Sequence, residues 1–172
     1  MTIYRNALSG DAVRLAALSI EVWLNTYAKS GISNIFADYV LQRFTSENFQ
    51  SIIADAERQV ILCEEDDRLL GHIALDYKPT LPDSLTTRTG SAEITTLYVR
   101  SRHAGRGIGK ALMQQARNAA SARNLGHIWL SVLHDNQRAL NFYQQQGMER
   151  QGSVWFELSG ERHKNFVLIQ PV

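Results

Sequence analysis

Cysteine, proline and an excess of one charge sign are all scarce in this sequence. The single cysteine, Cys63, excludes an internal disulfide, and the apolar residues 60–62 before it favour a buried strand position over a nucleophile. The formal net charge of +1 argues against bulk nucleic-acid binding, because that usually requires a concentrated basic face. With only three prolines and 44% hydrophobic content, the 172 residues suit one compact domain over 1–172.

Long apolar runs are absent as well. No run reaches the length of a membrane span, and the amino terminus lacks the basic-then-apolar pattern of a signal peptide. We therefore expect a cytoplasmic protein without membrane or nucleic-acid partners. No repeat, low-complexity segment or domain boundary is visible.

Glycines concentrate in one informative place, residues 104–110, which we call the glycine turn. It follows an apolar segment at 93–99 and precedes a helical pattern, so a strand, a turn and a helix start succeed one another. Glycine permits backbone angles closed to other residues, and the first N–H groups of a helix have no intrahelical partner. With the helix dipole and the cations Arg106 and Lys110, the turn predicts binding of a phosphate or pyrophosphate.

The spacing of the turn excludes two common nucleotide-binding motifs. A Walker A loop needs four residues between its glycine and the Gly-Lys pair and then Ser or Thr, whereas three residues separate Gly105 from Gly109 and Ala111 follows Lys110. The dinucleotide fingerprint needs a third glycine where Leu112 stands. Taken alone, the turn leaves a glycine-rich connection without any ligand as the alternative.

A second motif occupies residues 136–147, directly after an apolar strand at 127–133. Asp135 or Asn136 can cap the start of a short helix, and Gly147 suits its left-handed end. One face of this helix carries Ala139, Phe142, Tyr143 and Gln146. Core packing is the simpler interpretation of the two aromatic residues, although a buried Tyr143 hydroxyl would need a polar partner.

Together these segments resemble the Gcn5-related N-acetyltransferase family across residues 91–148. The resemblance implies acetyl-coenzyme A as co-substrate and no metal. The family's Gln/Arg-x-x-Gly-x-Gly/Ala pattern falls on residues 104–109 and departs at Ala104, which removes one side-chain contact while main-chain N–H groups still hold the phosphates; Arg102 or Arg106 could compensate. The implied coenzyme-binding residues are Leu97, Tyr98, Val99, Ala104, Gly105, Arg106, Gly107, Ile108, Gly109, Lys110, Asn136 and Tyr143.

The expected fold is α/β, a single-domain acyl-CoA N-acyltransferase fold with a central mixed twisted sheet flanked by helices. The helix after the glycine turn should bury Ile108, Leu112, Ala116 and Ala119. The other expected elements are a strand at 2–6, a helix from 11 to about 30 ended by Gly31, further helix within 34–56, a hairpin of 59–64 and 69–77 turning at Asp66-Asp67, a long loop at 78–90, and closing strands near 148–158 and 163–169.

The chemistry of acetyl transfer suggests two catalytic residues. A lysine-like amine is only about 0.04% neutral at pH 7, so attack on a thioester needs a base. Glu93 lies on the strand before the turn, where the histone-acetylating branch of the family has its catalytic glutamate; a surface or salt-bridged glutamate is the alternative. Tyr143 matches the family's general acid for the leaving thiolate. Transfer would then be direct, in a ternary complex, without use of Cys63.

The acceptor is the least defined part. By resemblance, the first two helices and the loop before the strand that precedes the glycine turn shape its pocket. Aromatic walls with a few carboxylates suit a small cationic amine. The candidates are Trp23, Tyr27, Phe36, Tyr39, Asp76, Tyr77 and Glu93, although Trp23 could equally be a core anchor. A peptide amino terminus or protein lysine is the alternative acceptor, and a non-catalytic acyl-coenzyme A sensor is the alternative function. A homodimer is one assembly the sequence allows.

Overall fold

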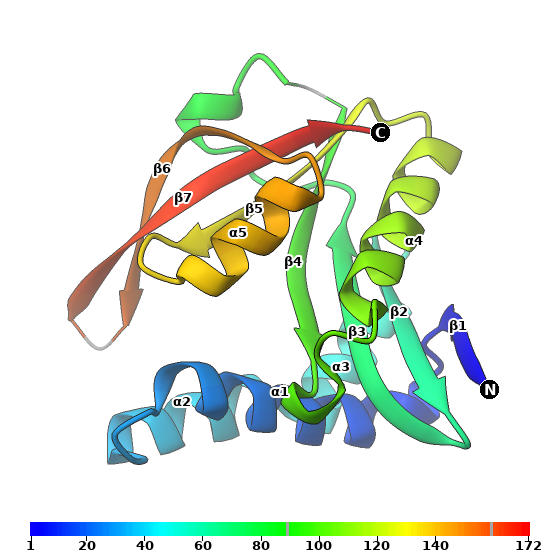
Figure 1. Cartoon of the computed structure of the whole chain (residues 1–172), viewed down its shortest axis with the longest axis vertical. Coiled ribbons are helices and arrows are strands. Elements are labelled where there is room, and N and C mark those ends of the chain that lie inside the picture. Colours follow the sequence, from blue (N-terminus) through cyan, green and yellow to red (C-terminus); the bar gives the residue numbers. More distant parts are fainter. Residues whose placement is uncertain (89, 159) are drawn as a thin grey trace. The chain divides into compact units, whose positions relative to one another are not determined.

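The computed structural model of the chain describes residues 1–88, 90–158 and 160–172. These residues form a seven-stranded mixed sheet with the order β1-β2-β3-β4-β5-β7-β6, together with five α-helices (Figure 1). The expected α/β fold with helices beside a mixed sheet is confirmed. The elements are β1 (Thr2–Asn6), η1 (Ser9–Asp11), α1 (Ala12–Tyr27), α2 (Asn34–Arg43), α3 (Ser46–Ala54), β2 (Arg58–Glu65), β3 (Arg68–Asp76), η2 (Asp83–Leu85), β4 (Ser91–Val99), η3 (Ser101–His103), α4 (Ile108–Ala122), β5 (His127–Leu133), α5 (Gln137–Gln145), β6 (Glu149–Leu158) and β7 (Glu161–Pro171), where η marks a short 3-10 turn.

Contacts within the chain gather in two compact units. The first, which we call the N-terminal unit, comprises Met1–Ala74 and Thr96–Leu112, and the C-terminal unit comprises Leu75–Thr95 and Met113–Val172. One functional domain over residues 1–172 stays a prediction.

The apolar face of α1 forms the core of the N-terminal unit with α3, β2 and β3. The buried members are Ala12, Leu15, Ala16, Leu18, Phe49, Val60, Leu62, Leu69 and Ala74. Cys63 is also fully buried, as expected from its apolar run, and burial raises the pKa of its thiol.

The end of the first helix differs from the prediction, and the further helix predicted within 34–56 is present as two helices. Helix α1 ends at Tyr27 rather than near residue 30, because Ala28 leaves helical angles, and the turn closes through the N–H of Gly31, which donates to the Ala28 carbonyl. The helical segment within 34–56 is two helices, since the Thr45 hydroxyl accepts from the Asn48 N–H and caps a new start at α3. Side-chain capping thus determines where the second of these helices begins, a boundary that the prediction left open.

The hairpin of β2 and β3 turns at Asp66 and Asp67, as predicted. Both residues have positive φ, 50° and 60°, which aspartate tolerates better than most residues. Strand β1 pairs antiparallel with β2, and Thr2 lies opposite Glu65.

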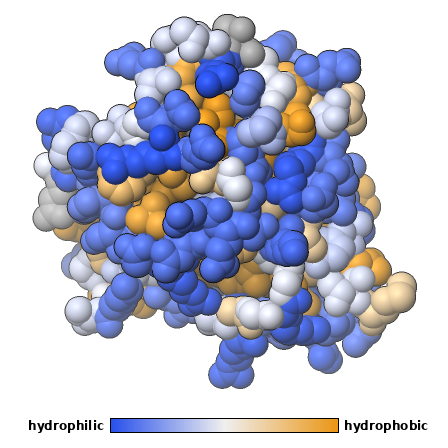
Figure 2. Space-filling model, turned by 45° about the horizontal axis from the view of Figure 1, so that its top comes forward, coloured by the Kyte–Doolittle hydropathy of each residue, from blue (hydrophilic) through white to orange (hydrophobic). Residues whose placement is uncertain are grey.

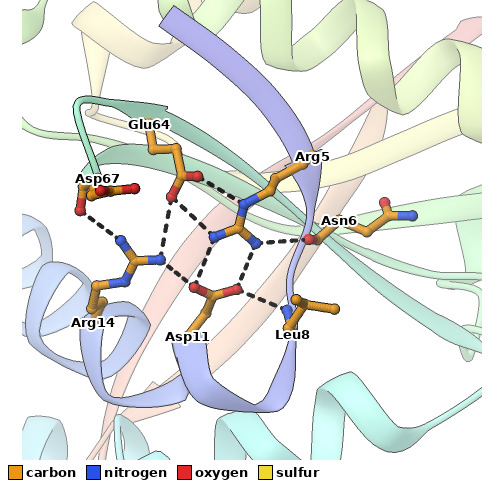
Figure 3. Close-up of polar contacts among 7 residues, drawn as sticks. All are labelled: Arg5, Asn6, Leu8, Asp11, Arg14, Glu64 and Asp67. Carbon is orange, nitrogen blue, oxygen red and sulfur yellow. Dashed lines mark hydrogen bonds and ion pairs between the residues drawn. The ribbon is translucent and has the colours of Figure 1, made fainter.

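A buried ion-pair network fixes β1, the start of α1 and β2 to one another (Figure 3). Arg5 donates to Asp11 at 2.7 Å and to Glu64 at 2.8 Å, and Arg14 bonds to the same two carboxylates. The hydrogen bonds from Arg5 hold the pKa of Asp11 and that of Glu64 below their usual range. With two cations and two anions, the network leaves no net charge in a largely buried site. No local sequence pattern predicts this network, because its members come from separate parts of the chain.

The C-terminal unit has its own apolar cluster, made of Leu85, Trp129, Val167 and Ile169. Leu85 belongs to η2, so the predicted long loop at 78–90 contains a 3-10 turn that is anchored in the core.

Helix α4 buries Ile108, Leu112 and Ala116 as expected. Met113 is buried as well, and Ala120, one turn after Ala116, is buried in place of the predicted Ala119, which is half-buried.

Hydrophilic residues cover most of the face that Figure 2 shows, and hydrophobic residues lie in patches between them. Within the described ranges, none of the helices combines the length and apolar character that crossing a membrane would require.

Candidate active site

The glycine turn has the backbone geometry expected of an anion-binding site. Gly105 and Gly107 have positive φ, 80° and 78°, and α4 begins directly afterwards at Ile108. The N–H of Ala111 donates to the Gly107 carbonyl, so the N–H groups of 108–110 precede the first helical bonds. An ideal Cβ on either glycine would meet no described atom within 4 Å. The main chain is therefore open to a ligand and shaped like an anion-binding nest.

The cations of the turn have different surroundings. The side chain of Lys110 is exposed, whereas Arg106 bonds to Glu65, with Nη2 at 2.9 and 3.2 Å from the two carboxylate oxygens. Its Nη1 also lies 2.9 Å from His103 Nδ1. The Arg106 guanidinium holds the pKa of Glu65 below its usual value. Glu65 already balances the charge of Arg106, so Arg106 attracts phosphate less strongly than the sequence alone suggested.

The strand before the turn joins β5 over a short parallel ladder. Its pairs are Ser91 with His127, Ala92 with Ile128 and Glu93 with Trp129, although both strands continue further along the chain. Ala92 and Ile94 are buried, and Glu93, between them, is half-buried on the opposite face. Glu93 is thus the last β4 residue in the ladder with β5.

Helix α5 has the predicted caps. The Asn136 side chain accepts from the Ala139 N–H at 3.2 Å, and Gly147 has φ 87°. Asn136 therefore fills the capping role that was one of its two predicted functions. The predicted face of the helix, which includes Phe142 and Tyr143, is half-buried rather than part of the fully buried core. The two rings meet edge to face at 5.2 Å.

The acceptor candidates of the N-terminal unit form an aromatic cluster around Trp23. The indole is 6% exposed and packs against Tyr27 and Tyr39 at centroid distances of 4.7 and 4.9 Å and against the edge of Phe36 at 5.2 Å. Trp23 is therefore a core anchor, the alternative that the sequence left open. Tyr27 is 40% exposed, and Phe36 and Tyr39 are half-buried.

Besides Glu93, the acceptor candidates of the C-terminal unit are Asp76 and Tyr77, and both have structural contacts. The Asp76 carboxylate accepts from the Lys78 N–H at 2.8 Å in the turn after β3. Tyr77 is buried beneath the guanidinium of Arg123, 3.9 Å from its ring centroid. Burial raises the pKa of Tyr77.

The glycine turn and the α5 motif both fall within a family match. The model of the acetyltransferase (GNAT) family matches residues 23–148. The chain belongs to this family. The resemblance stated from the sequence is therefore confirmed, and with it the expected enzyme class, an acetyl-coenzyme A-dependent N-acetyltransferase.

Relatives of this GNAT protein include an uncharacterized N-acetyltransferase of Mycobacterium bovis, 24% identical over 160 residues that cover 93% of this chain and 97% of the relative. The peptidyl-lysine N-acetyltransferase YiaC of Escherichia coli is 31% identical over 100 residues, 58% of this chain and 56% of that protein. Among solved structures, the PaiA N-acetyltransferase of Thermoplasma acidophilum in complex with coenzyme A has a TM-score of 0.78 at 18% identity, covering 100% of this chain and 99% of that one.

The structure groups the predicted site residues of this GNAT protein by unit. Leu97, Tyr98, Val99 and the glycine turn follow one another in the N-terminal unit, with the aromatic cluster around Trp23 in the same unit. Glu93, Asn136 and Tyr143 belong to the C-terminal unit. The catalytic and binding roles assigned to these residues stay predictions.

One polar residue near the predicted site escaped the sequence analysis. His72 on β3 is fully buried, its ring meets Phe49 and Tyr98 edge to face at 6.0 and 5.6 Å, and neither ring nitrogen bonds to a described atom. Burial lowers its pKa to about 3. A lone histidine within the apolar stretch at 69–75 was the signal that could have found it.

Proposed function

We propose that this protein transfers the acetyl group of acetyl-coenzyme A directly to a primary amine, and that the acceptor is a small cationic amine. The observation that carries the proposal is the open glycine turn at the start of α4. Gly105 and Gly107 are exposed and have positive φ, and an ideal Cβ on either would meet no described atom within 4 Å outside its two chain neighbours.

The coenzyme is held mainly through the main chain. The N–H groups of the glycine turn bind the pyrophosphate, the helix dipole and Lys110 add attraction for its charge, and Ala104 contributes no side-chain contact. The backbone of Leu97, Tyr98 and Val99 bonds to the amide-rich pantetheine arm in the manner of an added strand. Asn136 fixes the start of α5 through its cap.

Two side chains move protons in this proposal. The thioester supplies an activated acetyl group. Glu93, half-buried at the end of the ladder with β5, accepts a proton from the ammonium group of the acceptor, directly or through water, and the neutral amine then attacks the thioester carbonyl. Tyr143 on the half-buried face of α5 donates to the departing thiolate. No acyl-enzyme forms, in agreement with the complete burial of Cys63.

The acceptor proposal rests on aromatic side chains near the surface. Tyr27 is partly exposed, and half-buried Phe36 and Tyr39 lie around the same indole, Trp23. Aromatic faces attract a cationic amine. A protein or peptide lysine is the second candidate, favoured by the 31% identity over 100 residues to a peptidyl-lysine N-acetyltransferase.

A thiol-release assay over a panel of amines tests the proposal. Acetyl-coenzyme A should release coenzyme A fastest with small polycationic amines, more slowly with lysine peptides and peptides with a free amino terminus. Turnover only with peptides would favour the second candidate. Binding of acetyl-coenzyme A without turnover on any amine would favour the sensor function. A cytoplasmic location and a homodimer remain predictions for cell fractionation and sedimentation.

A further inference from the structure

Arg106 connects the glycine turn to the sheet. Residues 104–107 read Ala-Gly-Arg-Gly, so Arg106 is their only long side chain. It reaches Glu65, the last residue of β2, at 2.9 and 3.2 Å, and His103 at 2.9 Å. The two ends of this ion pair are 41 residues apart in sequence but belong to the same compact unit.

Glu65 is itself held in place. Its Oε1 accepts from the Thr2 hydroxyl at 2.9 Å, and the two residues lie opposite each other in the β1–β2 ladder. A carboxylate with a second hydrogen bond on a paired strand is a fixed partner for a guanidinium. The contact therefore connects the turn to a rigid element instead of to another mobile side chain.

We propose that Glu65 is a positioning residue for coenzyme binding, which it supports by holding the glycine turn through Arg106. Two glycines with positive φ flank Arg106, and glycine loses more conformational freedom on ordering than any other residue. A contact that fixes Arg106 in the free protein reduces the entropy that coenzyme binding would otherwise have to overcome. The inference rests on the proposed place of the pyrophosphate in the turn.

Competition between Glu65 and the phosphates for Arg106 would predict the opposite change in coenzyme affinity. If Glu65 only competed with the phosphates for Arg106, its removal would release a cation beside the turn and tighten coenzyme binding. If Glu65 holds the turn, its removal weakens binding although the local charge becomes more positive. The sign of the change therefore separates the two roles.

Glu65→Gln is the main test, because it removes the charge and keeps the size of the side chain. Asp66→Asn is the matched control. It removes a charge from the adjacent residue, whose carboxylate is paired with the amino terminus at 3.7 Å, and asparagine suits its φ of 50°. The dissociation constant of coenzyme A by calorimetry and the KM and kcat of acetyl-coenzyme A are measured for both variants.

We expect Glu65→Gln to raise the dissociation constant and KM about two- to fivefold, the range for a partly exposed ion pair, with kcat unchanged. Asp66→Asn should leave all three values at the wild-type level. Thr2→Val, which removes only the hydrogen bond to Glu65, should shift binding in the same direction by less. In the double variant with Arg106→Gln, adding Glu65→Gln should change nothing further, because their effects act through one contact.

Unchanged or tighter coenzyme binding in Glu65→Gln would overturn the inference. So would a lower kcat at unchanged KM. A wild-type protein that does not bind coenzyme A would instead refute the proposed function, so the two failures are distinguishable.

Discussion

Replacing Gly107 with alanine should abolish coenzyme binding at a small cost in stability. Gly107 has φ 78°, and a left-handed backbone angle costs an alanine about 1 to 2 kcal/mol. No described atom lies within 4 Å of the added methyl group, so no clash adds to this cost. For a chain of this size, each kcal/mol lowers the melting temperature by about 2 to 4 °C, which gives a loss of about 2 to 8 °C.

The effect on the coenzyme is larger because the same open space is the proposed pyrophosphate site. Acetyl-coenzyme A at 100 times its dissociation constant stabilises the folded wild type by about 2.7 kcal/mol. That stabilisation corresponds to a rise in melting temperature of about 5 to 11 °C. In Gly107→Ala, the methyl group would stand between the phosphate and the main-chain N–H groups, so this rise should vanish.

Thermal unfolding with and without ligand measures both effects. Gly160→Ala is the control, because Gly160 has φ 83° and equally open surroundings but lies between β6 and β7. It should melt lower by a similar amount and keep the full rise with acetyl-coenzyme A, while ATP with magnesium and NAD should stabilise none of the proteins. An undiminished rise in Gly107→Ala, or equal stabilisation by ATP with magnesium, would refute the placement of the pyrophosphate.

Three further predictions concern proton transfer and acid stability. Glu93→Gln should lower turnover about 10²-fold or more near neutral pH, with partial recovery at alkaline pH where more amine is neutral; an unaltered rate and pH profile would return Glu93 to a structural role. Tyr143→Phe should slow single-turnover acetyl transfer by about 10 to 10³ while coenzyme affinity survives, whereas a core aromatic would lose at most about 1 kcal/mol of stability and no activity. His72 is neutral in the folded protein, because burial lowers its pKa to about 3. Its contribution to the stability of the fold is therefore fully present above the pKa of an unfolded histidine, near 6.5, and declines as the pH falls below that value. From pH 7 to pH 5 the loss is about 2 kcal/mol, and His72→Leu should remove this part of the pH dependence in urea unfolding; identical pH profiles would contradict it.

Local sequence signals predicted those turns and helix ends that depend on residues close to one another in the sequence. The Asp66-Asp67 pair predicted the turn of the hairpin, and Gly147 predicted the end of α5. The spacing of the glycines predicted the turn before α4. The signals predicted helix within 34–56 but not the boundary at Thr45, whose cap begins α3. Apolar spacing alone does not reveal such a cap, because serine and threonine are also common in loops and turns.

Contacts between distant residues could not be predicted from the sequence. Arg5 and Glu64 are 59 residues apart, and Arg106 and Glu65 are 41 apart, so no local pattern links the partners. For the candidate site, the sequence identified the turn and the α5 motif but not the partner that holds Arg106. Nor could it tell that Trp23 is enclosed by other aromatic rings, since a helical pattern gives a residue's face and not what covers it.

The pairing of β1 with β2 has a consequence for how the chain is made. Thr2 hydrogen-bonds to a residue 63 positions later, so during synthesis the first strand emerges long before its partner. At ordinary elongation rates of about 5 to 20 residues per second, it waits about 3 to 13 seconds. Until then Arg5 also lacks Glu64, and only Asp11 is available nearby to pair with it. The pairing of the nascent first strand therefore depends on the pace of the ribosome, and slower translation of residues 58–65 should lengthen its exposure.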